Sequence, residues 1–86
     1  MTLKEGVRNS VLAIRRTIAE GKWVDADIFL EGLANWYEDL QNVYPQEKLN
    51  KFLRLMNHLA LQIRDKRPNL GRIDCNGLLK QIDELP

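Results

Sequence analysis

The sequence predicts an all-α fold, a small three- or four-helix bundle with three main antiparallel helices and a short C-terminal helix. Large apolar residues recur at spacings of three and four in three long stretches, which is typical of amphipathic helices. Only a few residues separate these stretches, and short connections favour antiparallel neighbours. A chain of this length supplies about one hydrophobic core, so residues 1–86 are expected to form a single helical domain.

The first predicted helix follows a capping box, in which the Thr2 hydroxyl and the Glu5 carboxylate satisfy backbone amides at the helix start. Gly21 is well placed to end this helix. Gly6 should weaken the first turn by roughly 0.5–1 kcal/mol relative to alanine, so the start is expected as late as Asn9 or Ser10. The apolar seam consists of Leu3, Val7, Val11, Ile14 and Ile18.

The second predicted helix lies within Trp23–Tyr44, and the other helices are expected to pack around it. Asp25 or Asp27 can cap its start, and Pro45 ends it. Its apolar side chains cover nearly half of the circumference, whereas one neighbour requires a sector of only about 100°. We therefore expect neighbours on two sides, and Gly32 is expected to let a second backbone approach closely. The heptad seam consists of Phe29, Leu33, Trp36, Leu40 and Val43.

The third predicted helix, about Gln46–Lys66, ends before Pro68 because the residue preceding a proline disfavours helical geometry. Its seam consists of Leu49, Phe52, Met56, Leu59 and Ile63. Residues Pro68–Ile73 are predicted to be a linker. Asp74 is predicted to cap a last helix of about 11 residues, which is too short to persist unless it docks on the others.

Charge is strongly segregated along the chain, although the formal net charge is only +1. Residues 1–22 carry a net charge of +3, residues 23–44 carry −5, residues 45–73 carry +5 and residues 74–86 carry −2. The acidic second helix is therefore expected to lie between two basic helices and to pair with them along the seams. Each exposed pair contributes only about 0–1 kcal/mol, so the pattern selects the topology more than it stabilises the fold.

The residue types needed for catalysis or metal binding are scarce. The chain has one histidine, one cysteine, one serine and no glycine-rich phosphate loop. His58 falls opposite the apolar seam of its helix, where a solvated side chain is the simplest interpretation. A zinc site requires about three or four Cys or His ligands, and the acidic helix has no Glu-x-x-His motif. We therefore predict no catalytic residue, no metal and no cofactor, and expect that the chain is not an enzyme.

Cys75 is expected to be a small residue in the first turn of the last helix with no redox role; the alternative is a thiol whose pKa is lowered by the nearby helix N-terminus. A single cysteine excludes an internal disulfide and favours a reducing compartment. No stretch reaches the roughly 18 apolar residues of a membrane span, and the charged N-terminus does not resemble a signal peptide. We therefore expect a cytoplasmic protein with no membrane partner.

Surplus apolar and aromatic side chains indicate a binding role. Trp and Tyr are enriched among residues that dominate interface energies, and several leucines fall outside the seams. The leading hypothesis is a non-enzymatic protein–protein interaction module, a small regulator, inhibitor or adaptor of bacterial or phage type, with a homodimer as a secondary expectation. The predicted partner-binding residues are Trp23, Tyr37, Leu12, Arg8, Arg15 and Leu61, of which Trp23 and Tyr37 are expected to be partly exposed.

A nucleic-acid-binding regulator is the alternative hypothesis, because phosphate contacts from basic side chains dominate such affinity. The basic faces of the first and third helices would supply these contacts. The residues concerned are Lys4, Arg8, Arg15, Arg64, Lys66, Arg67 and Arg72. The near-neutral net charge and the acidic helix between the two basic faces weigh against this alternative.

Overall fold

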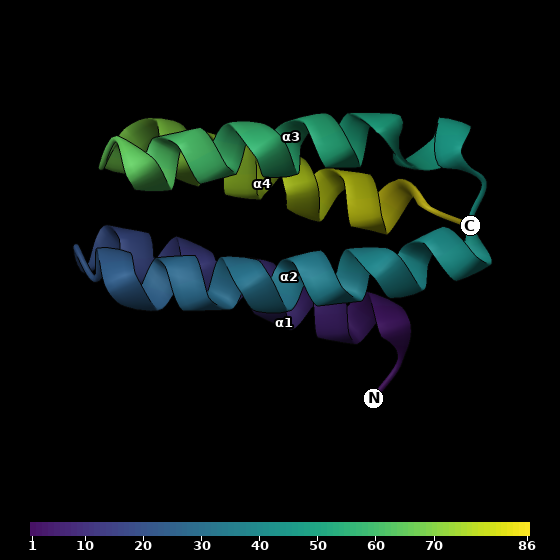
Figure 1. Cartoon of the computed structure of the whole chain (residues 1–86). Coiled ribbons are helices and arrows are strands. Elements are labelled where there is room, and N and C mark those ends of the chain that lie inside the picture. Colours follow the sequence, from purple (N-terminus) through teal and green to yellow (C-terminus); the bar gives the residue numbers. More distant parts are fainter.

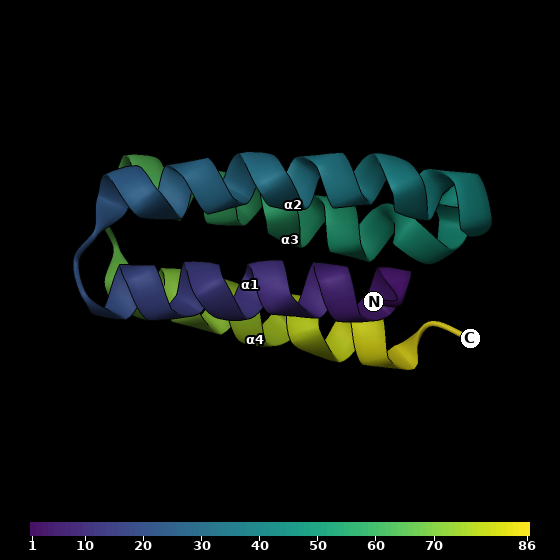
Figure 2. The ribbon, with the colours of Figure 1, turned by 90° about the horizontal axis from the view of Figure 1, so that it is seen from below.

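Four antiparallel α-helices form a bundle in the computed structural model, which describes residues 1–86 (Figure 1). The helices are α1 (Leu3–Ala19), α2 (Trp23–Val43), α3 (Gln46–Arg64) and α4 (Pro68–Glu84). Each helix packs on two neighbours: α2 and α4 both contact α1, and both also contact α3. The pair α1–α2 and the pair α3–α4 form two layers, and both termini lie at the same end of the bundle (Figures 1 and 2). The predicted all-α bundle is confirmed, but the last helix is not short, because α4 has 17 residues, as many as α1.

The core is one cluster of 17 buried apolar side chains contributed by all four helices. The predicted seam of α1 is confirmed at Val7, Val11, Ile14 and Ile18, all of which are buried. Burying a large side chain such as that of Phe52 in α3 stabilises the fold by about 1.5–3 kcal/mol. The periodicity of the sequence therefore locates most of the core.

Helix α1 begins at Leu3, and Thr2 caps it as the sequence predicts, but the Glu5 carboxylate bonds the Thr2 hydroxyl and not a backbone amide. The Thr2 hydroxyl oxygen accepts a hydrogen bond from the Glu5 backbone amide at 3.2 Å, and the hydroxyl donates to the Glu5 carboxylate at 3.0 Å. The predicted later start at Asn9 or Ser10 is wrong. The indole of Trp36 packs on the backbone of Gly6, where an added Cβ would lie 2.4 Å from a ring atom. A side chain at residue 6 would displace the Trp36 ring, so Gly6 serves helix packing and does not mark a weak turn.

Helix α2 begins at Trp23, before the predicted capping residues Asp25 and Asp27, and no side chain caps it. Its buried line consists of Ala26, Leu33, Tyr37 and Leu40. The predicted seam is therefore wrong at its two ends, because Phe29 is 38% exposed and Val43 is 64% exposed. The helix is rotated so that its core side lies toward Tyr37 and away from Phe29.

The predictions for Gly32 and for the stretch Pro68–Ile73, which contains Gly71, are wrong. Gly32 faces open space, with no atom within 4 Å of an added Cβ, so no backbone approaches it. Gly71 lies inside α4, where an added Cβ would lie 3.0 Å from the Ile18 side chain of α1. The stretch Pro68–Ile73 is therefore helical and is not a linker, with Pro68 in the first turn, where its missing amide is tolerated. Asp74 lies in the helix interior and caps nothing.

The acidic helix α2 packs between α1 and α3, as the width of its apolar arc predicts. The predicted charge pairing along these seams is wrong, because none of the five carboxylates of α2 forms an ion pair. The four ion pairs are Arg8–Asp83, Lys22–Glu20, Arg64–Asp65 and Arg67–Asp65. The negative charge of α2 is therefore left for solvent or for a partner.

We predict that Gly6→Ala and Gly32→Ala change stability in opposite directions. The methyl group at residue 6 overlaps the Trp36 ring, which should cost about 1–3 kcal/mol of unfolding free energy. The methyl group at residue 32 meets open space and should add roughly 0.5–1 kcal/mol by restricting the unfolded chain. Urea unfolding followed by circular dichroism measures both changes, and a Gly6→Ala protein as stable as the wild type would contradict the packing of Trp36.

Candidate protein-binding surfaces

The six predicted partner-binding residues do not lie on one surface. Trp23 is half-buried and lines a hollow between α2 and α3. Leu61, which is 44% exposed, lies on α3. Leu12, Arg8 and Arg15 lie on α1, where Leu12 is half-buried and packs on the core. No single partner contact can therefore use the predicted set as a whole.

Tyr37, predicted to be partly exposed, is a core residue that is only 4% exposed. Its ring stacks on that of Phe52 with a centroid separation of 6.0 Å. Its hydroxyl oxygen accepts a hydrogen bond from the Gln46 side-chain amide at 2.9 Å. The polar end of the ring is thus satisfied inside the protein, and Tyr37 offers nothing to a partner.

Three basic residues of α1 are engaged with α4 or with Leu85, which follows it. Arg8 forms an ion pair with Asp83 at 2.5 Å, and Arg15 donates to the Asn76 side-chain oxygen at 2.8 Å. The Lys4 ammonium group donates to the backbone carbonyl of Leu85. Three of the seven basic residues in the nucleic-acid alternative therefore already have partners within the chain.

The other basic residues of that alternative lie around the turn between α3 and α4. Arg64 donates to Asp65 at 3.1 Å, and Arg67 approaches the same carboxylate at 3.9 Å. The hydrogen bond from Arg64 lowers the pKa of Asp65 and raises the pKa of Arg64. Lys66, with φ of 54°, adopts the left-handed conformation that ends α3, and Arg72 is exposed on α4. The turn thus presents an exposed basic cluster built around one acid.

A hollow of about 290 Å³ between α1 and α2 is lined mainly by neutral and aromatic side chains. Phe29 and the half-buried Trp36 form its α2 side. The α1 side is made by small residues one turn apart, which leave room beside the aromatic rings. The lining residues are Met1, Gly6, Asn9, Ser10, Ala13, Phe29 and Trp36. The row of small residues in the first helix was the sequence signal for this hollow, which we did not predict.

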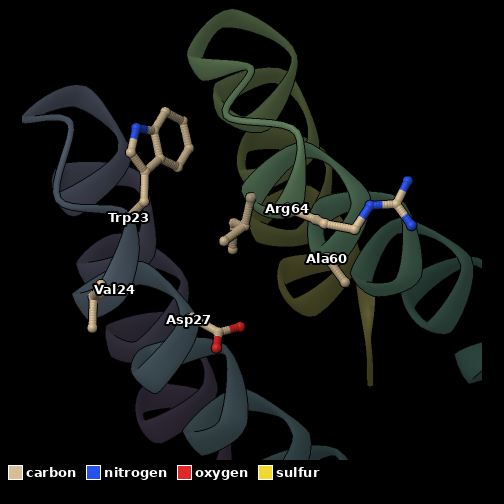
Figure 3. Close-up of a pocket in the computed structure, with 6 residues that line it drawn as sticks. Trp23, Val24, Asp27, Ala60 and Arg64 are labelled. Atoms are coloured by element: carbon tan, nitrogen blue, oxygen red, sulfur yellow. The ribbon is translucent and has the colours of Figure 1, made fainter.

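The seam between α2 and α3 is hollowed at two neighbouring places. The larger hollow, of about 330 Å³, is lined by Trp23, Val24, Asp27, Ala60, Ile63 and Arg64. Figure 3 shows Trp23 and Asp27 reaching from α2 toward α3, with Ala60 opposite them and Arg64 extending away from α2. The smaller hollow, of about 180 Å³, is lined by Leu30, Ala34, Met56, Asn57 and Ala60. Because Ala60 borders both hollows, they form one apolar groove along this seam.

A partly buried polar cluster lies between α3 and α4. One carboxylate oxygen of Asp74 and the side-chain carbonyl oxygen of Gln62 are buried without a hydrogen-bond partner. Burial raises the pKa of Asp74, although the charge of His58 and a hydrogen bond from Gln62 act in the opposite direction. Ionisation of Asp74 therefore comes at some cost to stability.

Cys75 is fully buried about two turns inside α4. Burial raises the pKa of its thiol to about 12, with a smaller opposing effect from Arg15. The predicted position in the first turn is wrong, because α4 begins at Pro68 and carries Cys75 into the core, so the helix N-terminus does not lower this pKa. The residue acts as a small apolar side chain.

No three of the His, Cys, Asp and Glu side chains gather where they could hold a metal ion. None of the four helices is both long enough and apolar enough to cross a membrane. Comparison of the chain with protein families, with curated proteins and with solved structures found no match.

We predict that Asp74→Asn stabilises the protein at pH 7 by on the order of 1 kcal/mol, because an amide can hydrogen-bond to Gln62 without a buried charge. The folded-state pKa of Asp74 is raised, so its ionisation lowers stability as the pH rises above the ordinary value of 3.8. The gain should therefore vanish near pH 3. Thermal unfolding at both pH values tests this, with the exposed Asp39→Asn as a control that should change stability by less than about 0.5 kcal/mol.

We predict that Cys75 reacts with an aromatic disulfide reagent at pH 8 only when the protein unfolds. The thiol is buried, and a pKa of about 12 leaves almost no thiolate at that pH. Labelling followed by absorbance should be slow in buffer and complete within the mixing time in concentrated urea. Rapid labelling of the native protein would show that α4 opens locally.

Proposed function

We propose that this chain is a non-enzymatic protein-interaction module, a small regulator, inhibitor or adaptor of bacterial or phage type, and that it binds its partner through α2. One observation carries the proposal. The exposed large apolar side chains are Met1, Val24, Ile28, Phe29, Val43, Leu61, Leu70 and Ile73. Half of these eight lie on α2, which holds only 21 of the 86 residues.

The hollow between α1 and α2 is the part of this surface best suited to a partner side chain. Phe29 and Trp36 present aromatic surface there, and aromatic side chains are enriched among the residues that dominate binding energies. No charged side chain lines the hollow, so an entering apolar group would meet no charged side chain that it must desolvate. Ile28, which is 58% exposed, lies next to Phe29 on the same helix and extends the apolar surface.

The carboxylates of α2 add a charge preference to this surface. Asp25 and Asp39 are exposed, form no ion pair and lie on the same side of α2 as Gly32 and Ile28, by their spacing along the helix. Unpaired carboxylates beside an apolar hollow favour a partner with a basic rim around an apolar anchor, and they speed its association. Lys4, Arg8 and Arg15, which nucleic-acid binding would need, already have partners within the chain, so a protein partner is favoured over a nucleic acid.

We predict that Ile28→Ser/Phe29→Ser weakens capture of a partner from a host lysate by roughly thirtyfold, the equivalent of about 2 kcal/mol for a dominant contact. The control is Leu70→Ser/Ile73→Ser on α4, which removes two apolar side chains of similar exposure and should leave capture unchanged. Titration of the immobilised chain, with mass spectrometry of the bound fraction, measures both effects. Equal loss in the two variants, or capture that disappears after nuclease treatment, would contradict the proposal.

A further inference from the structure

The groove between α2 and α3 has an apolar floor that the protein leaves partly uncovered. Leu30 and Met56 pack on the core but are only partly buried. Of the four neighbouring helix pairs, α2 and α3 contact each other least. The two hollows, which meet at Ala60, follow this loose seam. A further structural element that packed along the seam would therefore bury apolar surface that is now exposed to solvent.

The two sides of the groove carry opposite charges. On α2, Asp27 and Ala34 line the hollows. Glu31 lies four residues after Asp27 and Glu38 lies four residues after Ala34, so both fall on the same side of the helix. None of these three carboxylates forms an ion pair within the chain.

The α3 side of the groove is basic. Asn57 and Arg64 line the hollows. Arg54 lies three residues before Asn57 and Leu61 lies three residues before Arg64, so both fall on the same side of α3. Arg54 has no ion-pair partner, and Arg64 contacts only the exposed carboxylate of its neighbour Asp65. The groove is thus acidic along one edge, basic along the other and apolar between them, which is a self-complementary pattern.

The charge pattern distinguishes between the two symmetric ways in which a second copy can cover this face. A two-fold axis perpendicular to the helices would place α2 on α2 of the second copy, with carboxylates facing carboxylates. A two-fold axis parallel to the helices places α2 on α3 of the second copy, so that each acidic edge meets a basic edge. Like charges in contact are costly at an interface, so the second arrangement is favoured.

The charged residues are also level with one another along the helices. Asp27 lies opposite Ala60 and Arg64 across the groove (Figure 3). Glu38 lies about one turn beyond Ala34 on α2, and Arg54 lies about one turn beyond Asn57 on the antiparallel α3, in the same direction. A two-fold axis parallel to the helices leaves the position of each residue along the helix direction unchanged. Asp27 would therefore meet Arg64 of the other copy, and Glu38 would meet Arg54 of the other copy.

We propose that the α2–α3 face binds a second copy of this chain, through a two-fold axis parallel to the helices, to give a dimer of two four-helix bundles. This face is separate from the hollow between α1 and α2 to which the partner-binding proposal refers. The dimer therefore stands or falls independently of that proposal, and each has its own variants.

Complementary charge reversal tests this arrangement. One variant is Asp27→Lys/Glu38→Lys and the other is Arg54→Glu/Arg64→Glu. By sedimentation equilibrium the wild type should show twice the 10.0 kDa of one chain, whereas each variant alone should show only the single-chain mass. An equimolar mixture of the two variants should recover the dimer mass, because all four of its charged contacts then join opposite charges. Circular dichroism should show unchanged helicity, since all four side chains are exposed.

The control Asp25→Lys/Asp39→Lys makes the same change in net charge on the same helix but away from the groove, and it should remain dimeric. A wild type that keeps the mass of one chain over a hundredfold range of concentration would overturn the dimer. A dimeric wild type whose reversed variants stay dimeric alone, or fail to combine when mixed, would overturn the proposed face and axis. Neither result changes the expected capture by the Ile28→Ser/Phe29→Ser variant.

Discussion

The architecture depends on the apolar surface of α2, which is larger than two neighbouring helices can cover. In a square bundle a helix buries one side toward the core and part of each flank toward its neighbours. Leu33, Tyr37 and Leu40 fill the core side of α2. The remaining apolar side chains fall on both flanks, where Phe29 and Trp36 lie toward α1 and Trp23 and Leu30 lie toward α3. The bundle closes around α2 but leaves a hollow on each side of it.

The two flanks are closed to different degrees because their neighbours differ. On the α1 side, Gly6, Ser10 and Ala13 are small enough for the helices to approach, and the Trp36 ring lies directly on the backbone of Gly6. On the α3 side, the two helices contact each other less and leave a longer groove, which Leu30 and Met56 line. Close packing therefore fixes α1 against α2, whereas the α2–α3 seam retains uncovered apolar surface.

Electrostatics reinforces this division between a closed side and an open side of the bundle. The cross-helix polar contacts of α1 go to α4, through Arg8 with Asp83 and Arg15 with Asn76. The acids of α2 receive no such contact, so its charge remains on the outside of the molecule. Exposed charges that have no internal partner add little to stability. They are better suited to orienting an approaching protein, and they surround the two hollows in which apolar contact is available.

The sequence alone determined the helical periodicity, the cap at Thr2 and the helix ends at Gly21 and Pro45, because these depend on local backbone chemistry. It also determined that α2 lies between two helices, because this depends on the width of its apolar arc. Only the tertiary structure decided how α2 is rotated, which buries Tyr37 and exposes Phe29, since rotation is set by the summed burial against both neighbours. It also decided that Gly6 and Gly71 are packing positions inside helices, because a glycine between close helices and a glycine that weakens a helix look alike in sequence. The hollows beside α2 follow from that rotation and spacing, so the surfaces could not be located before the helices were placed.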